Sequence, residues 1–234
     1  MSLRVGAIQS AYIPWRGYFD FIASVDLFVI YDDVPYSKNS WRNRNRIKTK
    51  RGTEWLTIPV HGHLNEAIDE VTIADQNFVA RHRMKLSESL GEAPHFADAI
   101  GLFEAGIVPG LRNLSLQNES LIKSICSYLG ITTRLVRARD LGLKGAKTER
   151  LIDLLEKTGG TTYVSGPSAS SYLEVERFKE KGITLEYKTY DYEPYAQLHG
   201  PFVGDVTVLD LIANEGPRAR QLCRTRLIDT PGGR

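Results

Sequence analysis

The run of residues 27–31, Leu-Phe-Val-Ile-Tyr, constrains the fold of this chain more than any other stretch. It carries no charge, and strands that are apolar on both sides are typical of parallel sheets covered by helices on both faces. A β-like run at residues 4–9 precedes it, and residues 18–24 between the two runs show helical apolar spacing. The order strand, helix, strand predicts an α/β fold.

The same alternation continues along the chain. Helical spacing is found at residues 78–89, 111–129, 148–156, 175–181 and 206–214, and β-like runs at residues 54–60, 68–73, 132–138, 161–165 and 183–190. We expect one α/β domain over residues 1–224, with a mainly parallel sheet flanked by helices, in the manner of Rossmann-like or nucleotidylyltransferase-like folds. Residues 78–130 are expected to form a helical insertion, lid or subdomain, and residues 225–234 a flexible C-terminal tail.

Composition places the chain among globular proteins. With 234 residues and 42% apolar content it can bury a substantial core. The 30 Lys and Arg residues nearly balance 28 Asp and Glu residues, so nucleic acid is an unlikely partner and any basic surface must be local. The apolar runs are too short to span a membrane, and the two cysteines, Cys126 and Cys223, are far apart without a metal-binding spacing. We expect a cytoplasmic protein that has no membrane partner.

A basic block follows the second predicted strand. Its seven cations are uninterrupted by any acid before Glu54, and they are Lys38, Arg42, Arg44, Arg46, Lys48, Lys50 and Arg51. Arg42, Arg44 and Arg46 alternate with Asn43 and Asn45, and guanidinium groups suit phosphate or carboxylate while amides can recognise a sugar or an amide. The block therefore predicts an anion site; the alternative is a solvated basic loop.

Two adjacent carboxylates, Asp32 and Asp33, stand at the carboxyl end of the run at residues 27–31. Open α/β sheets bind ligands at this edge. Two close carboxyl groups can raise one another's pKa, which suits one of them to act as a general base. We expect Asp32 or Asp33 to be catalytic.

Other candidates for substrate binding lie in three segments. They are Gln9, Tyr12 and Trp15 in the loop after the first strand, Trp41 beside the basic block, and Tyr195 and Gln197 in an aromatic segment. Hydroxyl-rich residues 165–172 could receive phosphate, but without a GxSxG pattern Ser165 is not expected to be a nucleophile. His61 and His63 form an HxH pair, yet no second ligand cluster supports a metal site, and a turn is the simpler interpretation.

Several stretches together match the sequence pattern of a known family, and they are residues 7–9, 12–15, 17–19, 28–34, 41–48, 55–60, 195–197, 210–211 and 214–216. Through these stretches the chain resembles the WbqC-like protein family. The chain differs at Ser10, where the family usually has proline, and at His61 and His63. The resemblance implies a bacterial protein of surface-polysaccharide or specialised-metabolite pathways. The front half is also similar to pantothenate-synthetase-type nucleotidylyltransferases, but residues 14–18 replace their HxGH signature, so a shared fold is expected rather than shared chemistry.

These observations favour a biosynthetic transferase that forms an amide or ester on a phosphate-bearing substrate, either a nucleotide sugar or the phosphopantetheine of an acyl carrier protein. One alternative is a nucleotidylyl- or adenylate-forming enzyme, which would use ATP or CTP and magnesium. Another is a non-catalytic module that docks an acidic carrier protein. No cofactor is assigned, since magnesium belongs only to the first alternative.

Overall fold

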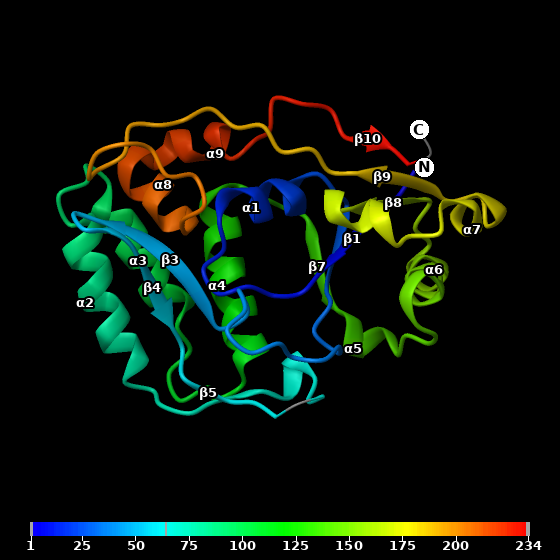
Figure 1. The fold of residues 1–234 in the computed structure, drawn as a ribbon, viewed down its shortest axis with the longest axis horizontal. Helices are drawn as coiled ribbons and strands as arrows, with labels where there is room; N and C mark the ends of the chain where they lie inside the picture. The colour runs from blue at the N-terminus through cyan, green and yellow to red at the C-terminus, as the bar shows by residue number, and fades with distance from the viewer. Residues whose placement is uncertain (1, 64, 233–234) are drawn as a thin grey trace.

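The centre of the molecule is a six-stranded sheet, seen in a computed structural model that describes residues 2–63 and 65–232 (Figure 1). The strands stand in the order β10, β9, β8, β1, β2, β7, and their bounds are Arg4–Ile8 (β1), Leu27–Ile30 (β2), Arg134–Arg137 (β7), Thr162–Ser165 (β8), Thr184–Tyr187 (β9) and Thr230–Pro231 (β10). Every pairing is parallel except that of β10 with β9. The mainly parallel α/β fold predicted from the apolar runs is confirmed.

Helices cover both faces of this sheet. Their bounds are Arg16–Ala23 (α1), Phe78–Leu90 (α2), Phe96–Gly106 (α3), Leu114–Tyr128 (α4), Ala138–Leu141 (α5), Lys147–Thr158 (α6), Val175–Glu180 (α7), Val208–Glu215 (α8) and Ala219–Leu222 (α9). Side chains alternate in β2, because Phe28 packs in one core cluster with α1, α4 and α8, whereas Leu27 and Val29 pack in another with α6 and α7. This explains why the strand has no polar face.

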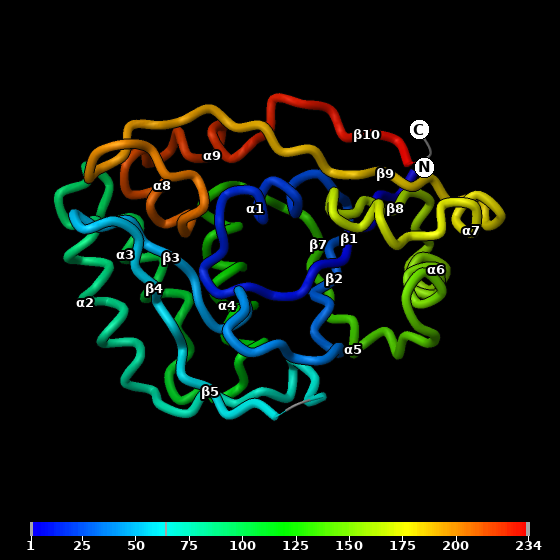
Figure 2. The backbone as a smooth tube through the Cα atoms, in the orientation of Figure 1, coloured from blue at the N-terminus to red at the C-terminus, as the bar shows by residue number. Residues whose placement is uncertain are grey.

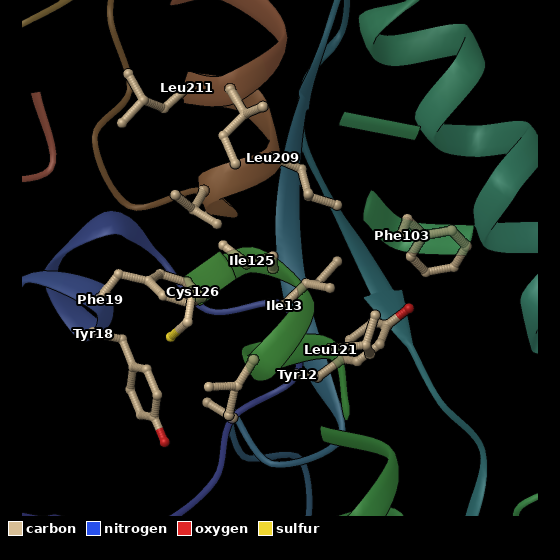
Figure 3. Packing of buried hydrophobic residues seen from close by; sticks show 14 of the residues in the cluster. Tyr12, Ile13, Tyr18, Phe19, Phe103, Leu121, Ile125, Cys126, Leu209 and Leu211 are labelled. Atoms are coloured by element: carbon tan, nitrogen blue, oxygen red, sulfur yellow. The ribbon is translucent and has the colours of Figure 1, made fainter. Parts of the chain in front are cut away.

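The larger cluster joins the helical region to the rest of the domain. In Figure 3, Ile125 and Cys126 of α4 lie near Phe19 of α1, and Leu209 of α8 packs in the same cluster. Residues 78–130, expected to be an insertion, lid or subdomain, thus share their core with the sheet. Cys126 and Cys223 are buried free thiols.

Two small antiparallel sheets lie beside the main sheet. One is a hairpin of β3 (Arg44–Thr49) and β4 (Gly52–Thr57), and the other pairs β5 (Val60–His61) with β6 (Thr72–Ile73). Much of the basic block is therefore a strand and not a loop. The strand expected at residues 68–73 shrinks to β6, because Ile68–Glu70 forms a 3-10 turn.

The C-terminal segment is paired with the sheet edge, unlike the free tail expected from its sequence. Thr230 and Pro231 pair with β9, and Asp229 forms ion pairs with Arg4 and Lys188. Figure 2 shows this segment running back beside the chain that follows β9. Pairing satisfies backbone groups that would otherwise lie open at an edge strand.

Candidate functional site

The topology of the sheet defines where a site can form. From β1 the chain moves to β2 and then β7 on one side, whereas β8 and β9 lie on the other side of β1. The connection after β1 leads to β2 on one side, and the connection after β8 leads to β9 on the other side. Such a reversal of direction between neighbouring strands opens a crevice beyond their carboxyl ends. Two cavities lie at this edge.

The larger cavity, here called the edge cavity, has a volume of about 870 Å³. Gln9 follows β1 into its wall, Ser165 ends β8, and Asp33, Lys147 and Arg150 supply its charges. A volume of several hundred Å³ is typical of pockets for small molecules and cofactors. The edge cavity is large enough for a nucleotide-sized ligand.

Asp33 and Arg150 form an ion pair in the wall of the edge cavity. The Arg150 Nη2 atom lies 2.5 Å from Asp33 Oδ2, and its Nη1 atom donates to the Leu143 carbonyl over 2.9 Å. Asp33 Oδ1 and Arg150 Nε are both buried without a hydrogen-bond partner among the described residues. Both groups therefore keep unused hydrogen-bonding capacity.

Helix α6 begins at the same wall. Its N-cap residue, Ala146, has no side chain that can bond the free amide groups of the first turn. Lys147 lies in the left-handed region with φ of 50°, a conformation that is uncommon for residues other than glycine and is often found at functional sites. Lys147 and Arg150 both line the edge cavity.

The smaller cavity, here called the ring cavity, has a volume of about 400 Å³ and adjoins the edge cavity, since Ile8 and Tyr190 line both. Aromatic side chains dominate its wall, and they are Trp15, Tyr18, Trp41 and Tyr190. The Trp15 ring lies against Gly17, where an added Cβ atom would be only 2.3 Å from it. The glycine therefore allows the indole to lie over the start of α1.

A buried polar network supports the ring cavity. Asp32 is only 2% exposed, and its oxygens accept hydrogen bonds from the Ser10 amide (2.7 Å) and the Ser115 hydroxyl (2.5 Å). Burial raises the pKa of the Asp32 carboxyl above its usual value, and the neighbouring Arg42 opposes this rise. The cause is burial and not the adjacent Asp33, contrary to our expectation.

The guanidinium groups of Arg42, Arg44 and Arg46 do not converge on one point. Arg42 lines the ring cavity, while the Arg44 guanidinium lies 4.1 Å from the centroid of the Trp55 ring. Arg46 is ion-paired with Asp205 near Trp41. Successive side chains of β3 point to opposite faces of the strand. Arg44 and Arg46 therefore lie on one face, and the buried asparagines lie on the other.

Asn43 and Asn45 lie on the buried side and bond to the backbone. Asn43 donates to the Ile58 carbonyl, and Asn45 donates to the carbonyls of Tyr12 and Ile13. These amides hold the hairpin against the loop after β1. Only Asn45 also lines the ring cavity.

Three further candidates, Tyr12, Tyr195 and Gln197, lie outside both cavities. Tyr12 is fully buried, with its hydroxyl 2.7 Å from His82 Nδ1. The Tyr195 hydroxyl and the Gln197 amide both donate to Asp210 Oδ1, each over 2.7 Å. Burial raises the pKa of Asp210.

Sequence reasoning missed Lys147, Arg150 and Tyr190 as site residues. Lys147 and Arg150 belong to an ordinary amphipathic helix. The one sequence signal that could have identified them is their place at the start of that helix, just after Gly145. Tyr190 is one of several tyrosines in the aromatic segment, and the sequence analysis predicted substrate binding for Tyr195 instead.

Within residues 2–63 and 65–232, no three His, Cys, Asp or Glu side chains are grouped as metal ligands would be. No described helix combines the length and apolar character needed to cross a bilayer.

Comparison with known proteins gives one family and one relative. The model of the WbqC-like protein family matches residues 9–222. The chain is 45% identical over 225 residues to the "Uncharacterized protein Rv1507c" of Mycobacterium tuberculosis, an alignment that covers 94% of this chain and 97% of that protein. No solved structure matches the chain significantly.

Proposed function

The chain belongs to the WbqC-like protein family, and from this premise we propose that it is a biosynthetic transferase that forms an amide or ester on a phosphate-bearing substrate. A nucleotide sugar or a phosphopantetheine arm occupies the edge cavity. The observation that carries the proposal is the cavity's position, at the carboxyl ends of β1 and β8, together with the cations Lys147 and Arg150 in its wall.

The phosphate is held at the start of α6. Free amide groups in the first turn of a helix point toward an anion, and the helix dipole favours negative charge there. Lys147 is exposed and forms no ion pair with a described residue, so its charge is available to the ligand. Arg150 adds a second positive charge, although part of it is neutralised by Asp33.

Asp33 acts as the general base. An amine or hydroxyl nucleophile attacks the acyl carbon of a thioester, its proton passes to Asp33, and the bond from carbon to sulfur breaks to release a thiolate, which is then protonated. Arg150 fixes Asp33 Oδ2, which keeps the carboxylate oriented. Asp32 is a positioning residue in this scheme, because its two oxygens are already bonded to Ser10 and Ser115.

Calorimetric titration with ADP, UDP-glucose and coenzyme A tests this proposal. We expect at least one of them to bind, and Lys147→Ala to weaken that binding about tenfold, since a hydrogen bond to a charged group contributes roughly 1.5–3 kcal/mol. Lys144→Ala is the matched control: it removes the same charge from an exposed residue that does not line the edge cavity.

Failure of all three compounds to bind would reject the proposal, as would equal effects of the two lysine variants. Titrations with and without magnesium separate the transferase from a nucleotidylyl-forming enzyme, since only the latter requires the ion to hold the phosphates.

A second candidate function, docking of an acidic carrier protein, is supported by the outer face of the hairpin. Trp41 and Trp55 are 43% and 39% exposed, and Arg44 covers part of the Trp55 ring. Aromatic residues and arginine are enriched at protein interfaces. Docking predicts that an acidic acyl carrier protein binds in a salt-sensitive manner and that the Arg44→Ala, Trp55→Ala double variant abolishes this binding.

A further inference from the structure

We propose that the ring cavity is a second binding site, which takes a small monocarboxylate with an apolar or aromatic body through the guanidinium of Arg42. Carboxylate binding is inferred from the ring cavity alone. It does not depend on the proposed function.

The first observation is the contrast between the walls of the two cavities. The ring cavity is mostly aromatic and aliphatic, with Ile8, Ala11 and Pro14 between its four rings. Such a wall favours the apolar part of a ligand, and its few polar groups fix the ligand's orientation. The edge cavity instead has three charged residues.

The second observation is that Arg42 has no partner in the described part of the chain. No ion pair or hydrogen bond joins its guanidinium to residues 2–63 or 65–232, although burial lowers the pKa of the group. Asp32 is near enough to stabilise its charge, but both Asp32 oxygens already accept hydrogen bonds. The guanidinium donors of Arg42 are therefore available to a ligand in the ring cavity.

The amide of Asn45 and the carboxylate of Asp205, which also line the ring cavity, are already paired. Asn45 donates to two backbone carbonyls and accepts from the Arg46 amide, and Asp205 is ion-paired with Arg46. Arg42 is therefore the cation in this wall whose donors are free to bind an anion.

The charge of the site favours a carboxylate over a phosphate. One guanidinium forms two parallel hydrogen bonds with a carboxylate and balances its single negative charge. A phosphate group carries nearly two charges and more acceptor oxygens, which a single cation in an apolar wall does not satisfy. Asp205 at the rim further disfavours a dianion.

Calorimetric titration with phenylacetate, hexanoate and phenylacetamide tests the inference. Phenylacetamide has nearly the shape of phenylacetate without its charge. We expect at least one of the two acids to bind, phenylacetamide to bind at least tenfold more weakly than phenylacetate, and Arg42→Met to weaken acid binding about ten- to a hundredfold. Arg44→Met is the matched control, because Arg44 lies outside the ring cavity on Trp55.

A second variant keeps the test decisive if Arg42→Met fails to fold. Ala11→Met leaves Arg42 in place but fills part of the ring cavity, and it should abolish acid binding. The inference is overturned if neither acid binds, if phenylacetamide binds as tightly as phenylacetate, or if Arg42→Met and Arg44→Met have equal effects.

Lys147→Ala separates this inference from the proposed function. It should leave phenylacetate binding unchanged while it weakens ADP, UDP-glucose or coenzyme A. If the acids bind and none of those compounds does, the ring cavity remains a carboxylate site and the transferase proposal fails; the reverse result rejects only the carboxylate site.

Discussion

The β3–β4 hairpin and the start of α6 both carry cations, but they use them differently. The arginines of β3 lie on its outer face, where Arg44 stacks on Trp55 and Arg46 pairs with Asp205. Lys147 and Arg150, at the start of α6, line the edge cavity. For the formation of an anion site, the direction of a charged side chain therefore matters more than the local density of charge.

The largest expected effect concerns catalysis on the α6 side. With a substrate pair identified by the titrations above, Asp33→Asn should lower the rate of the chemical step about 10²- to 10⁴-fold, because it removes the general base. Single-turnover product analysis by mass spectrometry measures this. Asp153→Asn, a paired carboxylate of α6 outside the edge cavity, should leave the rate unchanged. Full activity of Asp33→Asn would show that another group is the general base. The α6 side would then no longer differ from the hairpin by a catalytic role.

The next effect concerns the pH dependence of stability on the hairpin side, where His82 holds Tyr12. Burial lowers the pKa of His82 to about 4, so the unfolded state binds a proton more readily than the folded state. This contribution to stability is complete above a pH of about 6.5 and is lost as the pH falls toward 4.

Urea unfolding at several pH values measures that loss. Between pH 7 and pH 4 the parent protein should lose on the order of 3 kcal/mol more stability than His82→Asn. The difference between the two proteins is the quantity to compare, because the raised pKa values of Asp32 and Asp210 act in the opposite direction. Parallel pH profiles would show that His82 does not carry the effect.

A smaller loss of stability should follow Asn45→Ala. The variant removes the donor to two backbone carbonyls beneath the hairpin, and unsatisfied buried acceptors make it about 2 kcal/mol less stable. The midpoint of urea unfolding reports the change. A loss below about 0.5 kcal/mol would mean that water replaces the amide. The buried face of β3 would then contribute less to the free energy of unfolding than its hydrogen bonds suggest.

The smallest effect is expected for Arg44→Ala, the neighbour of Asn45 on the outer face. Arg44 is half-buried and forms no ion pair with a described residue, and a cation–π contact near the surface contributes about 0.5–1 kcal/mol, so the midpoint of unfolding should shift only slightly. ADP and phenylacetate should bind within twofold of the parent protein in calorimetry. A tenfold loss for either compound would place Arg44 in a ligand site and contradict the separation of the two regions.

Much of the fold was predictable because the apolar pattern reports burial. The continuous run at residues 27–31 contains β2, and the strand expected at residues 161–165 contains β8, so the positions of these two strands were predicted correctly. Helix α3 was missed. Its small residues, Ala99 and Gly106 among them, pack closely on neighbouring helices without producing a clear apolar stripe.

The site was harder to predict, since it depends on which residues meet across the sheet. Trp15, Trp41 and Arg42 do meet in the ring cavity, and Gln9 and Asp33 meet in the edge cavity. Tyr12 and Gln197 instead satisfy buried polar groups, which use the same residue types as a binding site. A single sequence cannot distinguish these two uses of a polar side chain.

Tyr190 and Ile8 form the boundary between the edge cavity and the ring cavity, and this has a consequence for how the protein can diversify. Because these two side chains line both spaces, a smaller residue at either position would join them into one larger chamber. Relatives could then accept longer or branched substrates through a single substitution, with the sheet, the cations of α6 and Arg42 left in place. Specificity in this fold would evolve fastest at the boundary, where a change alters the reach of the substrate without altering the groups that hold its ends.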